Sequence, residues 1–118
     1  MAVSIGTSSI AYPTQYSVQR KIHRTTVGKL IAIAQLGSIS PGQVAYATSD
    51  DDGINWSAWI LIAVGQSTAT IADIDSYIDT NNDIYVVYSN TAVNLYFRKL
   101  TYSAGSWSVG SAIYVAGS

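Results

Sequence analysis

The sequence of 118 residues contains no cysteine, no glutamate and only two prolines. Without cysteine, the chain cannot form disulfides or use thiolate chemistry. Charged residues make up 11% of the chain and the formal net charge is −1. Because there is no surplus of Lys and Arg to neutralise phosphates, we do not expect nucleic acid as a partner.

Signals for targeting and for membrane insertion are also missing. The first residues, MAVSIGTSSI, have no basic segment followed by an apolar run, so we expect no signal peptide. Every apolar run is far shorter than the roughly 20 residues of a membrane-spanning helix. The sequence therefore predicts a soluble chain. It leaves the compartment open, and a virion or a cell surface is compatible with it.

Residues that favour helices are scarce, and Tyr, Thr, Val, Ile, Ser and Gly dominate, which predicts an all-β fold. A chain of this length has room for one structural unit. Short strand-like runs separated by turn residues are expected at 16–25, 30–36, 44–49 and 56–63, and again at 70–78, 84–89, 94–102 and 107–115.

The two halves of the chain resemble each other. Leu30 aligns with Ile84, 54 residues later, and Trp56 aligns with Trp107, 51 residues later. A repeat of this length with four strands is typical of a propeller blade. The second strand of each half is apolar on both faces, as in a strand that is covered on both sides. We predict an N-terminal arm (1–15), a first blade (16–66) and a second blade (67–118).

The stretch TSDDDGINWSAWILI, which begins at Thr48, concentrates three carboxylates beside two tryptophans. An EF-hand loop would need acidic residues first and last, but Thr48 and Trp59 occupy those places. Neighbouring acids on one tight turn do not converge on a substrate as a catalytic pair. A hairpin turn that binds its own backbone amides explains these residues better, and we predict no metal site and no cofactor.

This stretch resembles the Asp-box, S-x-D-x-G-x-[T/N]-W, of BNR and sialidase-like β-propellers. The resemblance implies a turn between the third and fourth strands of a blade, on the perimeter, that stabilises the fold. The second half carries a degraded copy, SAGSW (103–107), without the aspartate. The residues that match the complete box are Ser49, Asp51, Gly53, Asn55 and Trp56.

Two blades cannot close a ring, and they would leave apolar faces exposed. Sialidase-like propellers have six blades, which implies a head-to-tail homotrimer of this chain. A dimer with four blades and a tetramer with eight are the alternatives.

The first strand of the first repeat is basic and the matching strand of the second repeat is acidic. Such strands line the channel of a propeller, so basic and acidic walls would alternate around the ring and oppose other arrangements. The predicted inter-blade charge pairs involve Arg20, Lys21 and Arg24 on one side and Asp73, Asp75 and Asp79 on the other. In the competing interpretation, Arg20 and Arg24 bind an acidic ligand.

The resemblance to sialidases does not extend to their catalytic residues. Those enzymes use an arginine triad, a tyrosine nucleophile assisted by glutamate, and an aspartate acid/base. This chain has no glutamate and lacks the R-I-P motif, since Pro13 stands in AYPT. We therefore predict a protein that is not an enzyme, in which His23 lines the channel rather than acting as a catalyst.

A glycan-binding, lectin-like module is the leading functional hypothesis, because tyrosine and tryptophan faces beside polar groups suit sugars, and symmetric copies increase avidity. The alternative is a structural or assembly protein of a virion or cell surface whose ring is itself the function. The possible ligand-binding residues are Arg20, His23, Arg24, Tyr46, Trp59 and Tyr102.

Overall fold

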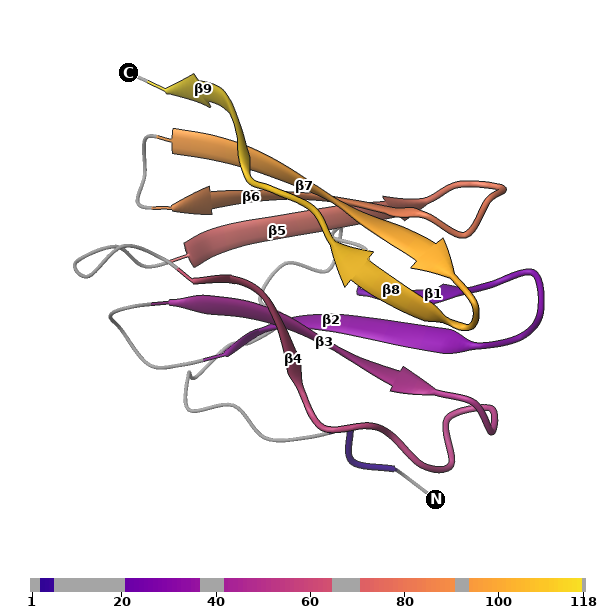
Figure 1. Cartoon of the computed structure of the whole chain (residues 1–118). Helices are drawn as coiled ribbons and strands as arrows, with labels where there is room; N and C mark the ends of the chain where they lie inside the picture. Colours follow the sequence, from indigo (N-terminus) through magenta and orange to yellow (C-terminus); the bar gives the residue numbers. More distant parts are fainter. Residues whose placement is uncertain (1–2, 6–20, 37–41, 65–70, 91–93, 118) are drawn as a thin grey trace.

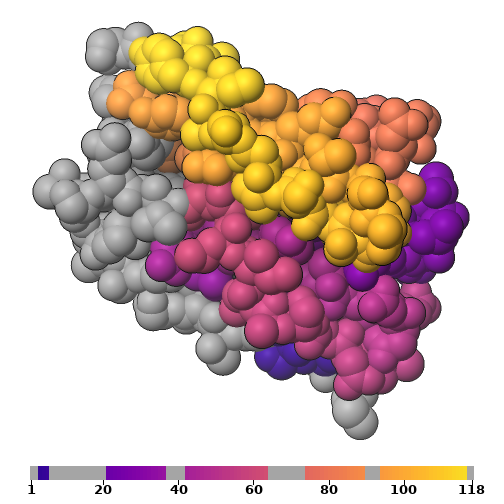
Figure 2. Space-filling view, in the orientation of Figure 1, coloured from indigo at the N-terminus to yellow at the C-terminus, as the bar shows by residue number. Residues whose placement is uncertain are grey.

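The computed structural model describes residues 3–5, 21–36, 42–64, 71–90 and 94–117. These residues form two antiparallel β-sheets that pack against each other, and they contain no helix (Figure 1). The predicted all-β class is therefore confirmed. No helix within these ranges is long and apolar enough to cross a membrane. Figure 2 shows the two sheets as layers in direct contact, with the second half of the chain (orange to yellow) against the first (violet to magenta).

The first sheet is a meander in the order β1-β2-β3-β4. Its strands are β1 (Ile22–Arg24), β2 (Leu30–Leu36), β3 (Gln43–Ser49) and β4 (Ile60–Val64). β4 begins at Ile60 rather than at residue 56 as predicted. The residues that follow β3 form a turn with three aspartates (50–55), which we call the Asp-rich turn. Ser57 nevertheless donates its backbone amide to the Thr48 carbonyl at 2.9 Å. Residues 16–20 of the predicted first strand lie outside the described residues.

The second sheet has the order β5-β6-β7-β8, and β9 also pairs with β7. Its strands are β5 (Ile71–Ile78), β6 (Ile84–Asn90), β7 (Asn94–Ser103), β8 (Ser106–Val109) and β9 (Ile113–Gly117). The single strand predicted at 107–115 is wrong, since β8 and β9 are separate. Gly110 lies between them, and its amide donates to the Lys99 carbonyl at 2.8 Å. A Cβ at Gly110 would stand 2.9 Å from the same oxygen, so this approach needs a glycine.

The two sheets have equivalent strand registers. Leu30 lies opposite Ser49, and Ile84 lies opposite Leu100. β2 therefore matches β6 with an offset of 54 residues, and β3 matches β7 with an offset of 51, the same two offsets as in the sequence alignment.

The turns that follow β1 and β5 are also equivalent. In each turn, the side chain of the first residue accepts the amide of the fifth, and the fourth residue has a positive φ. The three corresponding positions are Thr25, Gly28 and Lys29 in the first turn and Asp79, Asn82 and Asp83 in the second.

The core lies between the two sheets. Because alternate residues of a strand point to opposite faces, each sheet has an inner face toward the other sheet and an outer face. The inner faces contribute Ile31, Ile33, Val44 and Tyr46 from the first sheet and Ile84, Val86, Tyr88 and Leu100 from the second. Trp107 of β8 completes this cluster, with its ring edge-on to Tyr46 at a centroid distance of 6.5 Å.

The faces that meet in this core are not equivalent faces of the two repeats. Ile31 and Ile33, on the inner face of the first sheet, correspond to Tyr85 and Val87, on the outer face of the second. Conversely, Val86 on the inner face of the second sheet corresponds to an alanine on the outer face of the first. Repeats related by a twofold axis would bury like faces, whereas these repeats bury unlike faces, so their packing is head-to-tail.

Asn82 joins the two sheets at one end. Its side-chain oxygen accepts the Thr26 amide at 2.9 Å, and its side-chain nitrogen donates to the Thr26 hydroxyl at 3.0 Å. Its backbone carbonyl accepts the indole N–H of Trp107 at 2.8 Å. Asn82 is buried, and these bonds to the turn of the first repeat and to β8 supply the partners that its buried polar groups need.

Candidate functional site

The Asp-rich turn between β3 and β4 is held by bonds within the turn itself. The Asp51 carboxylate accepts the backbone amide of Asn55 at 2.8 Å and its side-chain amide at 2.7 Å. The hydroxyl of Ser49 donates to Asp51 at 2.8 Å and accepts the amide of Gly53 at 2.9 Å. Gly53 has φ of 87°, and its carbonyl accepts the indole N–H of Trp56 at 3.0 Å. These contacts occupy Asp51 with the turn's own groups.

The same contacts set the charge state of Asp51. The backbone amide of Asn55, then its side chain and the Ser49 hydroxyl, lower the pKa of Asp51 below its usual value, because each donates to the ionised form. The neighbouring carboxylates point to solvent: Asp50 lies 3.2 Å from Lys29 and Asp52 lies 2.6 Å from Arg24. The side chains of both acids are more than 70% exposed, so solvent screens these ion pairs.

A shallow groove runs beside this turn, with a volume of about 290 Å³. Trp56 is half-buried in it, while Asn55 and Asp50 are exposed. The lining residues are Thr48, Asp50, Asp51, Asn55, Trp56 and Ser57. The groove thus combines one indole with hydroxyl, amide and carboxylate groups.

Two of the predicted ligand-binding residues are part of the packing between the sheets. Tyr46 is 3% exposed, and its hydroxyl donates to the Trp107 carbonyl at 3.3 Å. Burial raises the pKa of this phenol. Tyr102 packs on the Trp107 ring with a centroid distance of 4.9 Å. The structure therefore places both tyrosines around Trp107 rather than on an open binding surface.

The other predicted ligand-binding residues are not gathered in one place. His23 is buried on β1, 2.7 Å from the Ser76 hydroxyl of β5. Arg24, on the opposite face of the same strand, forms the exposed ion pair with the Asp-rich turn. Trp59 is half-buried in the loop before β4, and its buried indole nitrogen has no hydrogen-bond partner within the described residues. Arg20 lies outside the described residues.

The basic strand β1 and the acidic strand β5 are neighbours within the chain. The Lys21 ammonium donates to the Ile74 carbonyl of β5 at 3.4 Å. Asp79 accepts the amides of its own turn and the Tyr85 hydroxyl, the latter at 2.8 Å. Asp75 is exposed on β5, and the side chain of Asp73 lies outside the described residues. Pairing between copies of the chain stays a prediction.

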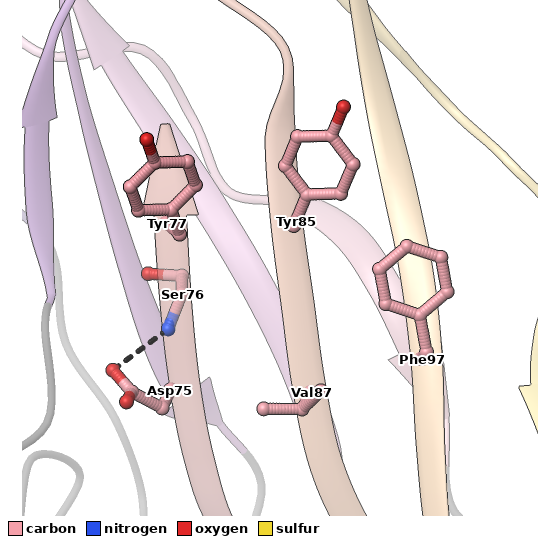
Figure 3. A pocket seen from close by; sticks show the side chains of 6 residues that line it. All are labelled: Asp75, Ser76, Tyr77, Tyr85, Val87 and Phe97. Atoms are coloured by element: carbon pink, nitrogen blue, oxygen red, sulfur yellow. Dashed lines mark hydrogen bonds between the residues drawn. The ribbon is translucent and has the colours of Figure 1, made fainter. Parts of the chain in front are cut away.

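The outer face of the second sheet carries an aromatic surface that the sequence analysis did not single out. Figure 3 shows Tyr77, Tyr85 and Phe97 side by side on β5, β6 and β7. Tyr85 stacks on Phe97 with a centroid distance of 6.0 Å, and Tyr77 is 6.4 Å from Tyr85. With Val87, which is 37% exposed, these residues form what we call the aromatic face. It lines a shallow depression of about 180 Å³.

A charged pair borders the aromatic face. Lys99 lies 3.0 Å from the Asp83 carboxylate and 5.5 Å from the centroid of the Tyr85 ring. The backbone amide of Tyr102, followed by Lys99, lowers the pKa of Asp83. Along β6, the outward residues Tyr85 and Val87 alternate with residues that point inward. Because β6 is apolar or aromatic on both faces, its sequence does not show which residues point outward.

Comparison with models of known protein families finds no match, and none of the curated proteins searched is similar to this chain. The Asp-box pattern therefore stays a resemblance carried by five residues of the sequence.

Proposed function

We propose that this chain supplies two blades of a β-propeller and that three copies close a ring of six. The head-to-tail packing of the two sheets carries this proposal. Consecutive blades of a propeller are related by rotation about the ring axis, so each blade presents one face to the blade before it and the other face to the blade after it. The burial of Ile31 and Ile33 in one repeat, and the exposure of the equivalent Val87 in the other, fit that arrangement.

A face-to-face sandwich of two sheets is the competing architecture, but it leaves the outer face of the second sheet unexplained. In a sandwich, the outer residues of an antiparallel sheet are mostly polar. Here three residues of the outer face, Tyr77, Val87 and Leu95, are apolar or aromatic and each is at least 37% exposed, although the same face also carries Asp75 and Lys99. A soluble chain covers such a surface with a partner or a ligand.

The ring would bring the basic β1 of one copy toward the acidic β5 of the next. Within the chain, these strands already approach through Lys21 and Ile74 and through His23 and Ser76. Alternating basic and acidic strands would favour the head-to-tail order over other associations, because like charges would never face each other.

We propose that the assembled protein binds glycans without catalysis. The groove beside the Asp-rich turn supports this assignment, because an indole together with exposed hydroxyl, amide and carboxylate groups suits the apolar face and the hydroxyls of a sugar. Asp50 and Asn55 supply exposed polar groups, and Trp56 supplies the ring. Three copies of the groove on one ring would increase avidity for multivalent glycans.

The described aspartates with several hydrogen bonds support a non-catalytic role. Asp51, Asp79 and Asp83 each accept at least one backbone amide, which assigns these carboxylates to turns and strand ends. The general acid and base of a glycosidase must instead face a substrate from two sides. The alternative function, a structural ring of a virion or cell surface, is favoured by the exposed aromatic face.

A glycan array with the purified protein separates the two functions. If a glycan binds, Asp50→Asn should weaken its binding about tenfold, since a charged hydrogen bond is worth about 1.5–3 kcal/mol and a neutral one about 0.5–1.5 kcal/mol. Asp52→Asn is the matched control, because this neighbouring acid is similarly exposed, does not line the groove, and has a φ of 60° that asparagine tolerates. Equal losses in both variants would contradict the groove assignment. A ring that binds no glycan would favour the structural alternative.

A further inference from the structure

The aromatic face is an open surface of the second sheet that carries large apolar side chains. Tyr77, on the edge strand β5, is 56% exposed, and Val87, on the inner strand β6, is 37% exposed. Leu95, at the end of the same face, is also 37% exposed. The three side chains project from neighbouring strands on one face, where the exposed Asp75 lies opposite Val87, so the patch combines apolar side chains with one carboxylate.

The repeat identifies the surface that fits this patch. Each position of the first sheet has an equivalent in the second, and the contacts within the chain show which positions meet when one repeat packs on the next. On the edge strands β1 and β5, His23 contacts Ser76 with a separation of 2.7 Å between their polar atoms. The residue equivalent to His23 is Tyr77, and the residue equivalent to Ser76 is Ile22, by the same offset of 54. If the packing is repeated between chains, Tyr77 therefore meets Ile22 of the next copy.

These two residues have the chemistry for such a contact. Ile22 is 55% exposed and Tyr77 is 56% exposed, so both are open apolar side chains in the single chain. The contact within the chain joins two polar groups at the equivalent place, whereas the contact between chains would join two apolar groups. Both pairs are chemically matched, and an exchange of partners would place a buried polar group against an apolar one.

Side-chain sizes across the two outer faces are complementary. On the aromatic face, Tyr85 is larger than its equivalent Ile31 in the first sheet. On the opposing surface, Ala32 and Ala34 stand where the second sheet has Val86 and Tyr88. The face with the larger side chains would thus pack against the face with the smaller side chains, which preserves close packing between the two sheets.

We propose that the aromatic face binds the outer face of the first sheet of a second copy of this chain, with Tyr77 against Ile22. This inference rests on the proposed ring and names its interface. The alanines of the opposing surface, including Ala45 and Ala47, are buried within the single chain, so the proposed contact is made first at Ile22, which is 55% exposed. Ile22, at the edge of that surface, is accessible without any rearrangement.

The absence of cysteine makes a direct test possible, because an introduced pair forms the only disulfide. We would prepare Ile22→Cys and Tyr77→Cys as single variants and as a double variant. These two side chains project from opposite outer faces, so they cannot join within one chain. On mild oxidation, the double variant should yield a covalent trimer, and an equimolar mixture of the single variants should yield the mixed dimer, identified by peptide mass.

The outcomes separate the interface from the ring. A native trimer without the Ile22–Tyr77 crosslink would overturn the interface and leave the ring intact. Crosslinked chains that extend beyond three copies would support the interface and overturn closure at six blades. A monomer that forms neither crosslink would overturn both proposals.

A second pair of variants tests the same face without a crosslink. Val87→Asp places a second carboxylate opposite Asp75 in the proposed contact and should raise the dissociation constant of the assembly at least about tenfold, since neighbouring carboxylates repel each other and are costly to bury. Ile54→Asp is the matched control, because Ile54 is 67% exposed on the turn between β3 and β4, outside the strands that form the two proposed contact faces. Circular dichroism should show folded protein in both cases. Unchanged association of folded Val87→Asp would contradict the proposed contact.

Discussion

Asn82 is the residue through which the two sheets can be uncoupled most selectively. Its side chain makes two hydrogen bonds to Thr26 of the other repeat, at 2.9 and 3.0 Å, and its φ is 66°. Each bond contributes about 0.5–1.5 kcal/mol, so their loss costs about 1–3 kcal/mol. An alanine at positive φ adds about 1 kcal/mol. We predict that Asn82→Ala lowers the free energy of unfolding by about 2–4 kcal/mol.

Asn82→Gly separates these two contributions, because glycine tolerates the positive φ but lacks the hydrogen bonds. It should cost about 1 kcal/mol less than Asn82→Ala. The assay is urea unfolding followed by tryptophan fluorescence, at one fixed protein concentration because association would contribute to the measured stability. A glycine variant as stable as the unmodified chain would show that the bonds to Thr26 contribute nothing. Equal stabilities of the two variants would refute the argument about backbone strain.

Three further predictions concern the core, a turn and the pH dependence of stability. Leu100→Ala should lower the free energy of unfolding by about 2–5 kcal/mol in urea titrations, because Leu100 is completely buried between the sheets; a loss below that of an exposed residue would contradict the assigned core. Ala104→Asn should raise the melting temperature, since Ala104 and Gly105 have φ of 52° and 83° in the two-residue turn between β7 and β8, and Asn-Gly suits such turns; a lower melting temperature would refute this. Asp51 has a lowered pKa in the folded state, so its ionisation stabilises the fold above the usual aspartate pKa and this stabilisation is lost as the pH falls through the folded value. As the pH falls from about 5 to about 2, the free energy of unfolding of Asp51→Asn should therefore decrease less than that of the unmodified chain. Urea unfolding at each pH measures this decrease, and an equal decrease in both proteins would contradict the role of this carboxylate.

The strands were predictable because their composition and the turn residues between them indicate the same boundaries. Runs such as LIAIAQL in β2 combine β-branched and apolar residues between turn residues, and the observed strand covers the predicted residues 30–36. The break between β8 and β9 was not predictable. It depends on how closely Gly110 approaches the Lys99 carbonyl, which is a contact between residues on different strands.

The orientations and partners of the predicted site residues could not be derived from the sequence. Tyr46 stands in the alternating run VAYATS, and alternation alone does not say which face meets the other sheet. The head-to-tail packing directs Tyr46 inward and leaves Tyr77 outward. Likewise, the partner of Arg24 in the structure is Asp52 on another loop. Seven aspartates are chemically equal candidates in the sequence, and only the fold determines which one lies within reach.

The mass of the protein in native buffer tests the central claim most directly. Sedimentation equilibrium at micromolar concentration should give three times the chain mass of 12.6 kDa, because two blades per chain close a ring of six only as a trimer. Two or four times the chain mass would keep the head-to-tail packing but contradict a six-bladed ring. A stable monomer of 12.6 kDa would contradict the account, since the aromatic face would then remain open to water.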